Sequence, residues 1–98
     1  MYAAIRQYEI GAGSLRDMME IVEKEFADTV AAQPGFVAYH VVASGGDEIV
    51  SVSIFSDEAS AVRSNDVAAQ FVRDHLAKFD VNLTSGMSGE IVVSRAGR

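Results

Sequence analysis

Five side chains have the chemistry needed to move a proton or to stabilise a negatively charged oxygen: Arg6, Tyr39, His40, Asn65 and His75. Histidine exchanges a proton near neutral pH, so His40 and His75 are the candidate bases. Arginine and asparagine donate hydrogen bonds, so Arg6 and Asn65 could bind an oxygen on which negative charge develops. Together these residue types predict proton transfer from an oxygen-bearing organic substrate, with catalytic roles for His40, Asn65 and His75 and substrate-binding roles for Tyr39 and Arg6.

His40 lies in a run of branched and aromatic residues, 36–43, that predicts a β-strand. Successive side chains of a strand point to opposite faces, so we expect Tyr39 and His40 on opposite faces of a sheet. Alternation places His40 on one face with a guanidinium, a phenol and two hydroxyls: Arg6, Tyr8, Ser51 and Ser53. That face would combine a base with an anion-stabilising cation, and it would equally serve as a polar seam that fixes the register of a dimer.

Asn65 lies on the inner stripe of a predicted helix, among small and apolar residues: Ala61, Ala68, Val72, Leu76 and Phe79. A buried amide without a partner costs about 1–3 kcal/mol, so this carboxamide must find a hydrogen bond. The partner is either a substrate oxygen or a group on a neighbouring strand or loop. His75 is expected near the carboxyl end of the same helix, where the helix dipole favours a partly exposed imidazolium.

Composition removes several classes of function. The sequence has a net charge of −6 and no basic stripe, so we expect no nucleic-acid partner. It has no cysteine and two histidines on separate elements, so we expect no metal site and no iron–sulfur cofactor. No apolar run approaches the length of a membrane span and the first residues lack a signal-peptide pattern, so we expect no membrane association and a cytoplasmic location.

The elements that must position these residues follow the order β-α-β-β-α-β. Strands are predicted at residues 2–9, 36–43, 48–55 and 89–94, with a tight glycine-containing hairpin at 44–47. A first helix is predicted over residues 14–32, because Ser14 can cap its amino end and Pro34 prevents its continuation. Ser56 is expected to cap a second helix, and a loop at residues 80–88 separates that helix from the last strand.

Two helices with one apolar stripe each are expected to pack on one face of a four-stranded antiparallel sheet. The result is a single α+β domain over residues 1–98, with ferredoxin-like βαββαβ topology. The other face of this sheet would still carry large apolar side chains in an isolated chain. An uncovered apolar face predicts a partner, so we expect a homodimer in which sheet packs against sheet.

Two short motifs accompany this order of elements. Pro34-Gly35-Phe36 enters the second strand with Tyr39 three residues further on, and Ile54-Phe55-Ser56-Asp57-Glu58-Ala59 leads into the second helix. Over nearly its whole length the sequence resembles the antibiotic biosynthesis monooxygenase-like families of the dimeric α+β barrel superfamily. The resemblance implies a homodimeric barrel and the oxidation of a small electron-rich aromatic, of polyketide or quinol type, by molecular oxygen without a metal or flavin.

Two other functions stay open. Enzymes of these families commonly have a tryptophan in or near the second helix, and this sequence has none, which favours a non-catalytic module for small-ligand binding or assembly. One branch of the superfamily binds and degrades haem with an asparagine on the first strand, where this sequence has Ala3, Ala4 and Gln7. Haem binding is therefore the third alternative.

Overall fold

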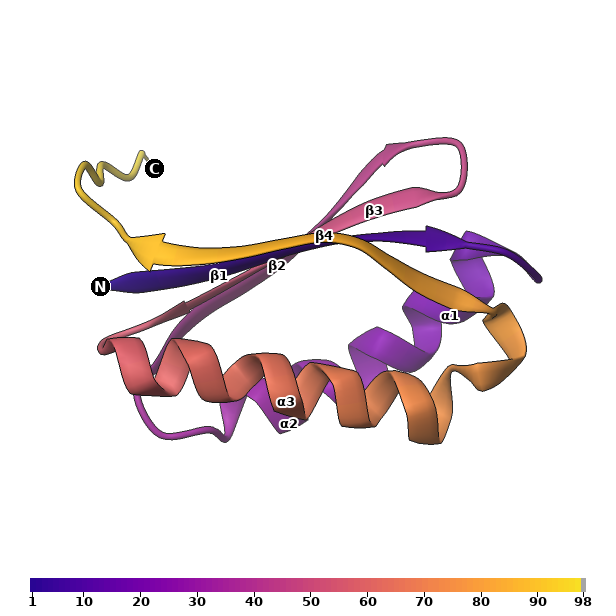
Figure 1. Ribbon diagram of the computed structural model, residues 1–98, viewed down its shortest axis with the longest axis horizontal. Helices are drawn as coiled ribbons and strands as arrows, with labels where there is room; N and C mark the ends of the chain where they lie inside the picture. Colours follow the sequence, from indigo (N-terminus) through magenta and orange to yellow (C-terminus); the bar gives the residue numbers. More distant parts are fainter. Residues whose placement is uncertain (98) are drawn as a thin grey trace.

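An antiparallel sheet of four strands forms one layer of the protein, and all the helices lie on one side of it (Figure 1). The computed structural model describes residues 1–97. The strands are β1 (Tyr2–Ile10), β2 (Phe36–Gly45), β3 (Glu48–Phe55) and β4 (Val81–Glu90), in the spatial order β2-β3-β1-β4. This order and the one-sided helical layer confirm the predicted ferredoxin-like fold.

The first helical stretch is continuous but changes geometry in its middle. It consists of α1 (Leu15–Ile21), the π-helical turn η1 (Val22–Phe26) and α2 (Ala27–Ala31). Its inward side chains are spaced by four residues: Met18, Val22, Phe26 and Val30. In a regular α-helix this spacing drifts by about 40° per step, because 3.6 residues complete a turn. The wider π turn offsets the drift, so all four side chains reach the sheet.

The β2–β3 hairpin corrects the predicted face of Tyr39 and His40. Gly46 adopts the positive φ of 57° that its tight turn requires. The resulting register pairs Tyr39 with Ser53 and His40 with Val52. Tyr39 therefore faces the helices together with the serines of β3, and His40 faces away from them. The prediction that grouped His40 with the serines was wrong because alternation within one strand does not give its register against the next strand, and a bulge between Phe36 and Ala38 shifts that register.

The second helix is α3 (Glu58–His75), and a short 3₁₀ turn, η2 (Ala77–Phe79), follows it. Asp57, rather than the predicted Ser56, caps α3, since its carboxylate accepts a hydrogen bond from the backbone N–H of Ser60 at 2.8 Å. Small residues and one aromatic form its buried stripe: Ser60, Ala61, Ser64, Ala68 and Phe71. Asn65 is half-buried at the flank of this stripe and not at its centre.

The last strand begins eight residues before its predicted start at residue 89. Residues 81–90 pair with β1 as β4, and residues 91–97 contain no regular strand. Most of β4 is exposed on both faces, so its sequence has no alternation that would reveal it, and backbone pairing with β1 alone defines it. A bulge interrupts this pairing between Gln7 and Tyr8, opposite Thr84. Bulges at such positions bend the edge of a sheet and re-aim nearby side chains.

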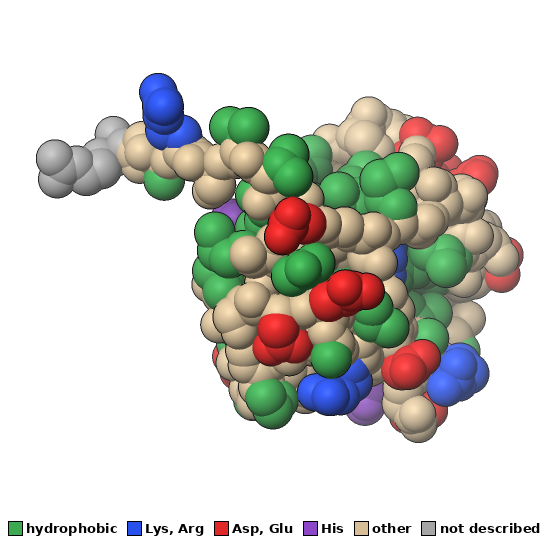
Figure 2. All heavy atoms as spheres, turned by 60° about the vertical axis from the view of Figure 1, so that its left-hand side comes forward, with side chains coloured by type: hydrophobic (Ala, Val, Ile, Leu, Met, Phe, Trp, Pro, Cys, Tyr) green, Lys and Arg blue, Asp and Glu red, His purple; other side chains and the backbone are tan. Residues whose placement is uncertain are grey.

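The sheet face opposite the helices is bare in the single chain (Figure 1). Its centre contains half-buried aliphatic side chains, among them Val50, Val52 and Ile54, and the more exposed Val42 lies on the edge strand β2. The segment after β4 projects from the body of the molecule with hydrophobic side chains on it (Figure 2), and Val92 and Val93 are 83% and 84% exposed. Within residues 1–97, no helix is long and apolar enough to cross a bilayer.

Candidate functional site

Arg6, in the middle of β1, buries its guanidinium between the sheet and α3, so that the residue is only 4% exposed. Its Nη1 donates a hydrogen bond to Oδ1 of Asn65 at 2.9 Å, and its Nη2 donates to Oγ of Ser53 at 3.0 Å. Among residues 1–97, no carboxylate forms an ion pair with it. Because both acceptors are neutral, Arg6 keeps a positive charge inside the protein without a counter-charge.

The contact with Arg6 fixes the orientation of the Asn65 carboxamide. Arginine can only donate hydrogen bonds, so the Asn65 atom that faces it must be the acceptor, Oδ1. The amino group of Asn65 therefore points elsewhere with two N–H donors. The sequence predicted that Asn65 would bind either a substrate oxygen or a group on a neighbouring strand or loop, and the structure shows a strand residue, Arg6, in this role. The amino group of Asn65 can still donate to a ligand.

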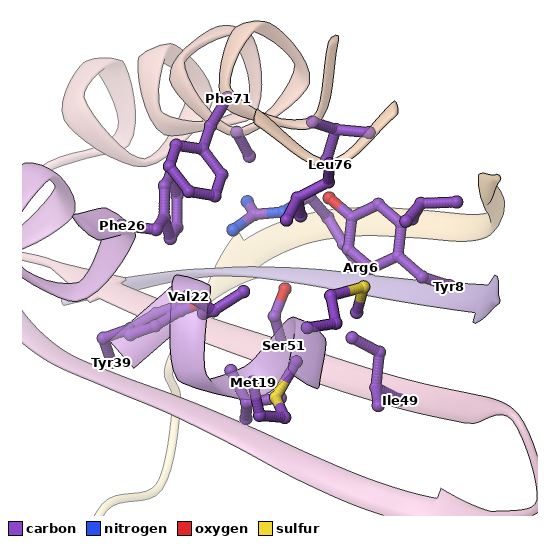
Figure 3. A pocket seen from close by; sticks show the side chains of 15 residues that line it. Arg6, Tyr8, Met19, Val22, Phe26, Tyr39, Ile49, Ser51, Phe71 and Leu76 are labelled. Atoms are coloured by element: carbon purple, nitrogen blue, oxygen red, sulfur yellow. The ribbon is translucent and has the colours of Figure 1, made fainter. Parts of the chain in front are cut away.

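A small chamber lies between the helices and the centre of the sheet (Figure 3). Its volume is about 30 Å³, which is room for roughly two water molecules and too little for an aromatic ligand. Ser51 points into it from β3, and Arg6 and Tyr8 enter from β1, while Phe26 and Phe71 close it from the helices (Figure 3). Nε of Arg6 and Oγ of Ser51 are buried here without a hydrogen-bond partner. These two atoms are the polar groups that a bound water would satisfy.

Tyr39 lines the same chamber from β2. Burial raises the pKa of Tyr39 to about 12, an effect that the positive charge of Arg6 opposes and Tyr8 reinforces. With this pKa the phenol remains protonated at neutral pH. Tyr39 can therefore donate a hydrogen bond but cannot serve as a base.

A larger groove of about 540 Å³ opens beside the chamber, between α3 and β4. Arg6 and Tyr8 line both spaces, so Arg6 forms part of the boundary between the small chamber and the larger groove. The other groove residues come from α3 and β4: Asn65, Ala69, Val72, Arg73, Val81, Leu83, Gly86, Met87 and Ser88. Within the described range 1–97, the groove lining thus includes two arginines and no acidic residue, and the groove volume is typical of small-molecule sites.

Gly86 leaves the space in front of Arg6 empty. It pairs directly with Arg6 across the β1–β4 ladder, so a side chain at position 86 would lie beside the guanidinium. A Cβ atom there would approach only the backbone oxygen of Ile5, at 3.9 Å. Glycine inside a strand often marks the place where a ligand comes close. Sequence reasoning missed Gly86 because it assigned residues 80–88 to a loop.

Neither histidine lies in the chamber or the groove. His40 is exposed on the bare face of the sheet, opposite Val52. His75 is exposed near the end of α3, where its ring stacks on Phe71 at 4.8 Å and its Nδ1 lies 3.9 Å from Oε2 of Glu25. The fold therefore brings Arg6, Tyr39 and Asn65 to one region and separates both predicted bases from it.

The described residues offer no set of metal ligands. Within residues 1–97, no three histidine, cysteine, aspartate or glutamate side chains come close enough to hold an ion. The acidic residues nearest to His75 form a separate surface hollow, which includes Glu25, Asp66 and Asp74.

Comparison with known proteins supports the fold. A family model described as antibiotic biosynthesis monooxygenase matches residues 1–74. No curated protein matches the sequence. A putative antibiotic biosynthesis monooxygenase from Chloroflexus aurantiacus has a similar structure, with a TM-score of 0.70, 14% sequence identity and coverage of 97% of this chain and 96% of that chain.

Two further solved structures are similar over their whole lengths. A dimeric ferredoxin-like protein from an uncultured marine organism has a TM-score of 0.75 at 9% identity, with 98% of both chains covered. A mutant of MhuD, crystallised with two manganese protoporphyrin IX molecules per active site, has a TM-score of 0.70 at 20% identity, with 99% of this chain and 100% of that chain covered. At these identities the likeness establishes the fold only.

Proposed function

Because the chain belongs to the antibiotic biosynthesis monooxygenase family, we propose that it oxidises a small electron-rich aromatic, such as an anthrone or a hydroquinone, with molecular oxygen and without a metal or flavin. The observation that supports this most directly is the Arg6–Asn65 hydrogen bond of 2.9 Å in the wall of the groove. Donors arranged in this way stabilise an oxygen atom that becomes negatively charged.

In the proposed reaction, the substrate binds with its hydroxyl or enol oxygen toward Arg6 and Asn65. The substrate loses a proton to water, the resulting oxyanion gives one electron to O₂, and the radical and superoxide so formed combine at carbon. The peroxide takes up a proton and then loses water. For an anthrone, one oxygen atom becomes the new carbonyl, and the two hydrogens of the oxidised carbon leave with the other oxygen as water.

The histidines predicted as bases have no role in this proposal. His40 faces away from the helical layer, and His75 lies beside the acidic hollow and not in the groove. Arg6 and Asn65 bind the developing anion directly, and Tyr39 lies in the adjoining chamber as a protonated phenol. The active site of the proposed oxygenase is therefore the groove together with its arginine wall.

Oxygen consumption with an anthrone or a hydroquinone tests the proposal. The purified protein should raise the rate above that of buffer in proportion to its concentration. Loss of one donor to an oxyanion typically lowers kcat by about 10²–10³-fold, so Asn65→Ala should lower the rate by about 10²-fold. Arg63→Met, which changes an exposed residue of α3 outside the groove lining, is the matched control and should leave the rate unchanged. A rate equal to that of buffer, or one insensitive to Asn65→Ala, would contradict the proposed reaction.

The same family membership leads us to propose a homodimer that buries the bare face of the sheet. Val52 and Ile54 lie near the centre of that face, where a second copy would cover them. An apolar sheet face of this kind is rarely left open in a monomer. Each dimer would then contain two grooves, one in each subunit.

Two alternative functions follow from specific observations. The absence of a histidine or carboxylate from the groove lining favours a module that binds a ligand without turnover, which would give saturable binding and no oxygen consumption. MhuD binds a metalloporphyrin, so haem remains the third alternative for this fold. Titration with haemin separates it, because ligation of the iron by a histidine shifts the Soret band.

A further inference from the structure

We propose that the groove binds its ligand as a preformed planar oxyanion, a carboxylate or a phenolate, with the Arg6 guanidinium as the counter-ion. For the oxygenase, this inference rests on the proposed function and narrows its substrates to phenols and enols acidic enough to release their proton to water without a protein base.

The unpaired charge of Arg6 is the first reason. Burial of an isolated ion costs several kcal/mol, and such a charge is normally matched by an opposite charge nearby. Arg6 is 4% exposed, and within the part of the chain that the structure describes its hydrogen-bond acceptors are the neutral side chains of Asn65 and Ser53. A protein retains an unmatched buried guanidinium at a cost in stability, and an anionic ligand would supply the missing charge.

The remaining hydrogen-bond donors are the second reason. Arginine has five N–H groups, and Arg6 uses one on each Nη atom, which leaves a second hydrogen on each Nη without an acceptor, while the buried N–H of Nε belongs to the chamber. The amino group of Asn65 adds two donors, since its oxygen is occupied by Arg6. A wall made of donors matches an oxygen anion, which accepts several hydrogen bonds and donates none.

The charges around the groove are the third reason. The titratable and charged groups in its lining are Arg6 and Tyr8 from β1 and Arg73 from α3, whereas β4 contributes none. The whole sequence has a net charge of −6, so a lining with two arginines and no acid is the reverse of the average surface. An acidic protein with such a groove would repel anions elsewhere and attract them here.

Gly86 provides the space that such a ligand needs. It faces Arg6 across the ladder, and a Cβ atom there would have the backbone oxygen of Ile5, at 3.9 Å, as its nearest non-neighbouring contact. A flat carboxylate or phenolate can therefore approach the guanidinium edge from the groove. The same geometry provides a blocking variant, because Gly86→Val would fill this space with a residue that suits a β-strand.

Titration of 4-nitrophenol tests the inference without any turnover. This phenol ionises near neutral pH, and only its phenolate absorbs strongly in the visible region. In the presence of excess protein, the apparent ionisation should shift to lower pH, so that at a fixed slightly acidic pH the phenolate fraction rises at least threefold. 4-Nitroanisole, which cannot ionise, should bind at least tenfold more weakly. Benzoate should displace the phenolate if the site takes carboxylates as well, and failure to displace it would restrict the class to phenolates.

Variants separate an anion site from non-specific binding. Arg6→Met and Gly86→Val should each weaken phenolate binding at least tenfold, whereas Arg63→Met, an exposed arginine on the same helix as Asn65, should leave it unchanged. Circular dichroism establishes that each variant is folded, and Arg6→Lys, which keeps the charge, should restore part of the binding. Equal affinity for 4-nitroanisole and 4-nitrophenolate, or full binding by both folded Arg6→Met and Gly86→Val, would overturn the inference.

The result is independent of the test of oxygenation. Phenolate binding that depends on Arg6, in a protein that consumes no oxygen, would remove the proposed oxygenase and keep the anion site. Oxygen consumption by a protein whose phenolate binding is unaffected by Arg6→Met would keep the proposed oxygenase and remove the anion site.

Discussion

Removal of the Ser53 hydroxyl is expected to change stability in opposite directions depending on whether Arg6 is present. Ser53 is fully buried, with 0% of its surface exposed, and accepts a hydrogen bond from Nη2 of Arg6 at 3.0 Å. Ser53→Ala leaves a charged donor without an acceptor where water does not reach, and hydrogen bonds to charged groups contribute about 1.5–3 kcal/mol. A loss of about 2 kcal/mol in a domain of this size lowers Tm by about 8–16 °C.

The sign reverses once the charge is gone. In Arg6→Met, the Ser53 hydroxyl itself is the unpaired buried group, and leaving such a group unsatisfied costs about 1–3 kcal/mol. Ser53→Ala in that background should therefore raise the free energy of unfolding by about 1 kcal/mol. The two effects give a coupling energy of about 3 kcal/mol, well above the ~0.3–0.5 kcal/mol within which independent sites add.

Urea unfolding of the wild type, both single variants and the double variant measures this coupling. Far-ultraviolet circular dichroism follows the transition at one fixed protein concentration, because association changes apparent stability. Ser64→Ala is the matched control, since this buried hydroxyl donates to the backbone oxygen of Ala61 at 2.6 Å and does not contact Arg6. Its cost should be the same with and without Arg6. An equal cost of Ser53→Ala in both backgrounds would refute the claim that Ser53 stabilises a buried charge.

Three further outcomes are expected. The pKa of Tyr39 rises from 10.0 to about 12 on folding, so between these two values the unfolded chain loses a proton that the folded chain keeps. The free energy of unfolding should therefore fall as the pH rises through this window. Urea titrations at each pH should show a smaller fall for Tyr39→Phe. Light scattering should give a dimer for the wild type and a monomer for Val52→Lys, whereas a monomeric wild type at micromolar concentration would contradict the proposed dimer. Acid should weaken the α3 cap, because hydrogen bonds from Ser60 hold the pKa of Asp57 below its usual value in the folded protein. The stability that this shift contributes is lost as the pH falls through the lowered pKa. Asp57→Asn removes this titration, so its acid unfolding should be less steep.

The sequence predicted the helices and strands that bury one face, because their apolar residues recur at regular spacing. β3 (Glu48–Phe55) has the predicted bounds because the side chains on one of its faces are buried and those on the other are only half-buried, so the residue types alternate. The last strand was predicted at residues 89–94 instead of 81–90, since an edge strand exposed on both faces requires no particular residue at any position. Its glycines and serines, typical of a loop, are tolerated because the ladder hydrogen bonds to β1 are made by the backbone.

The candidate site could be predicted in part. Alternation correctly placed Arg6, Ser51 and Ser53 on one face, because β1 and β3 are both regular there. The exchange of Tyr39 and His40 arose in β2, where a bulge near Val37 and the hairpin turn set a register that residue types do not reveal. The hydrogen bond between Arg6 and Asn65 joins residues 59 positions apart, and it depends on how α3 docks on the sheet. No local pattern contains that information.

The π-helical turn at Val22–Phe26 has a consequence for how this protein tolerates changes in length. Such a turn holds one more residue than an α-helix needs between the same two ends. Deletion of the exposed Lys24 would therefore let the segment relax into ordinary α-helix, while the flanking turns keep their rotation about the axis. In a regular α-helix, deletion of one residue rotates the part that follows and turns its apolar face away from the core. Here the same deletion is expected to cost little stability, so relatives that differ by one residue at this point can share the same interior.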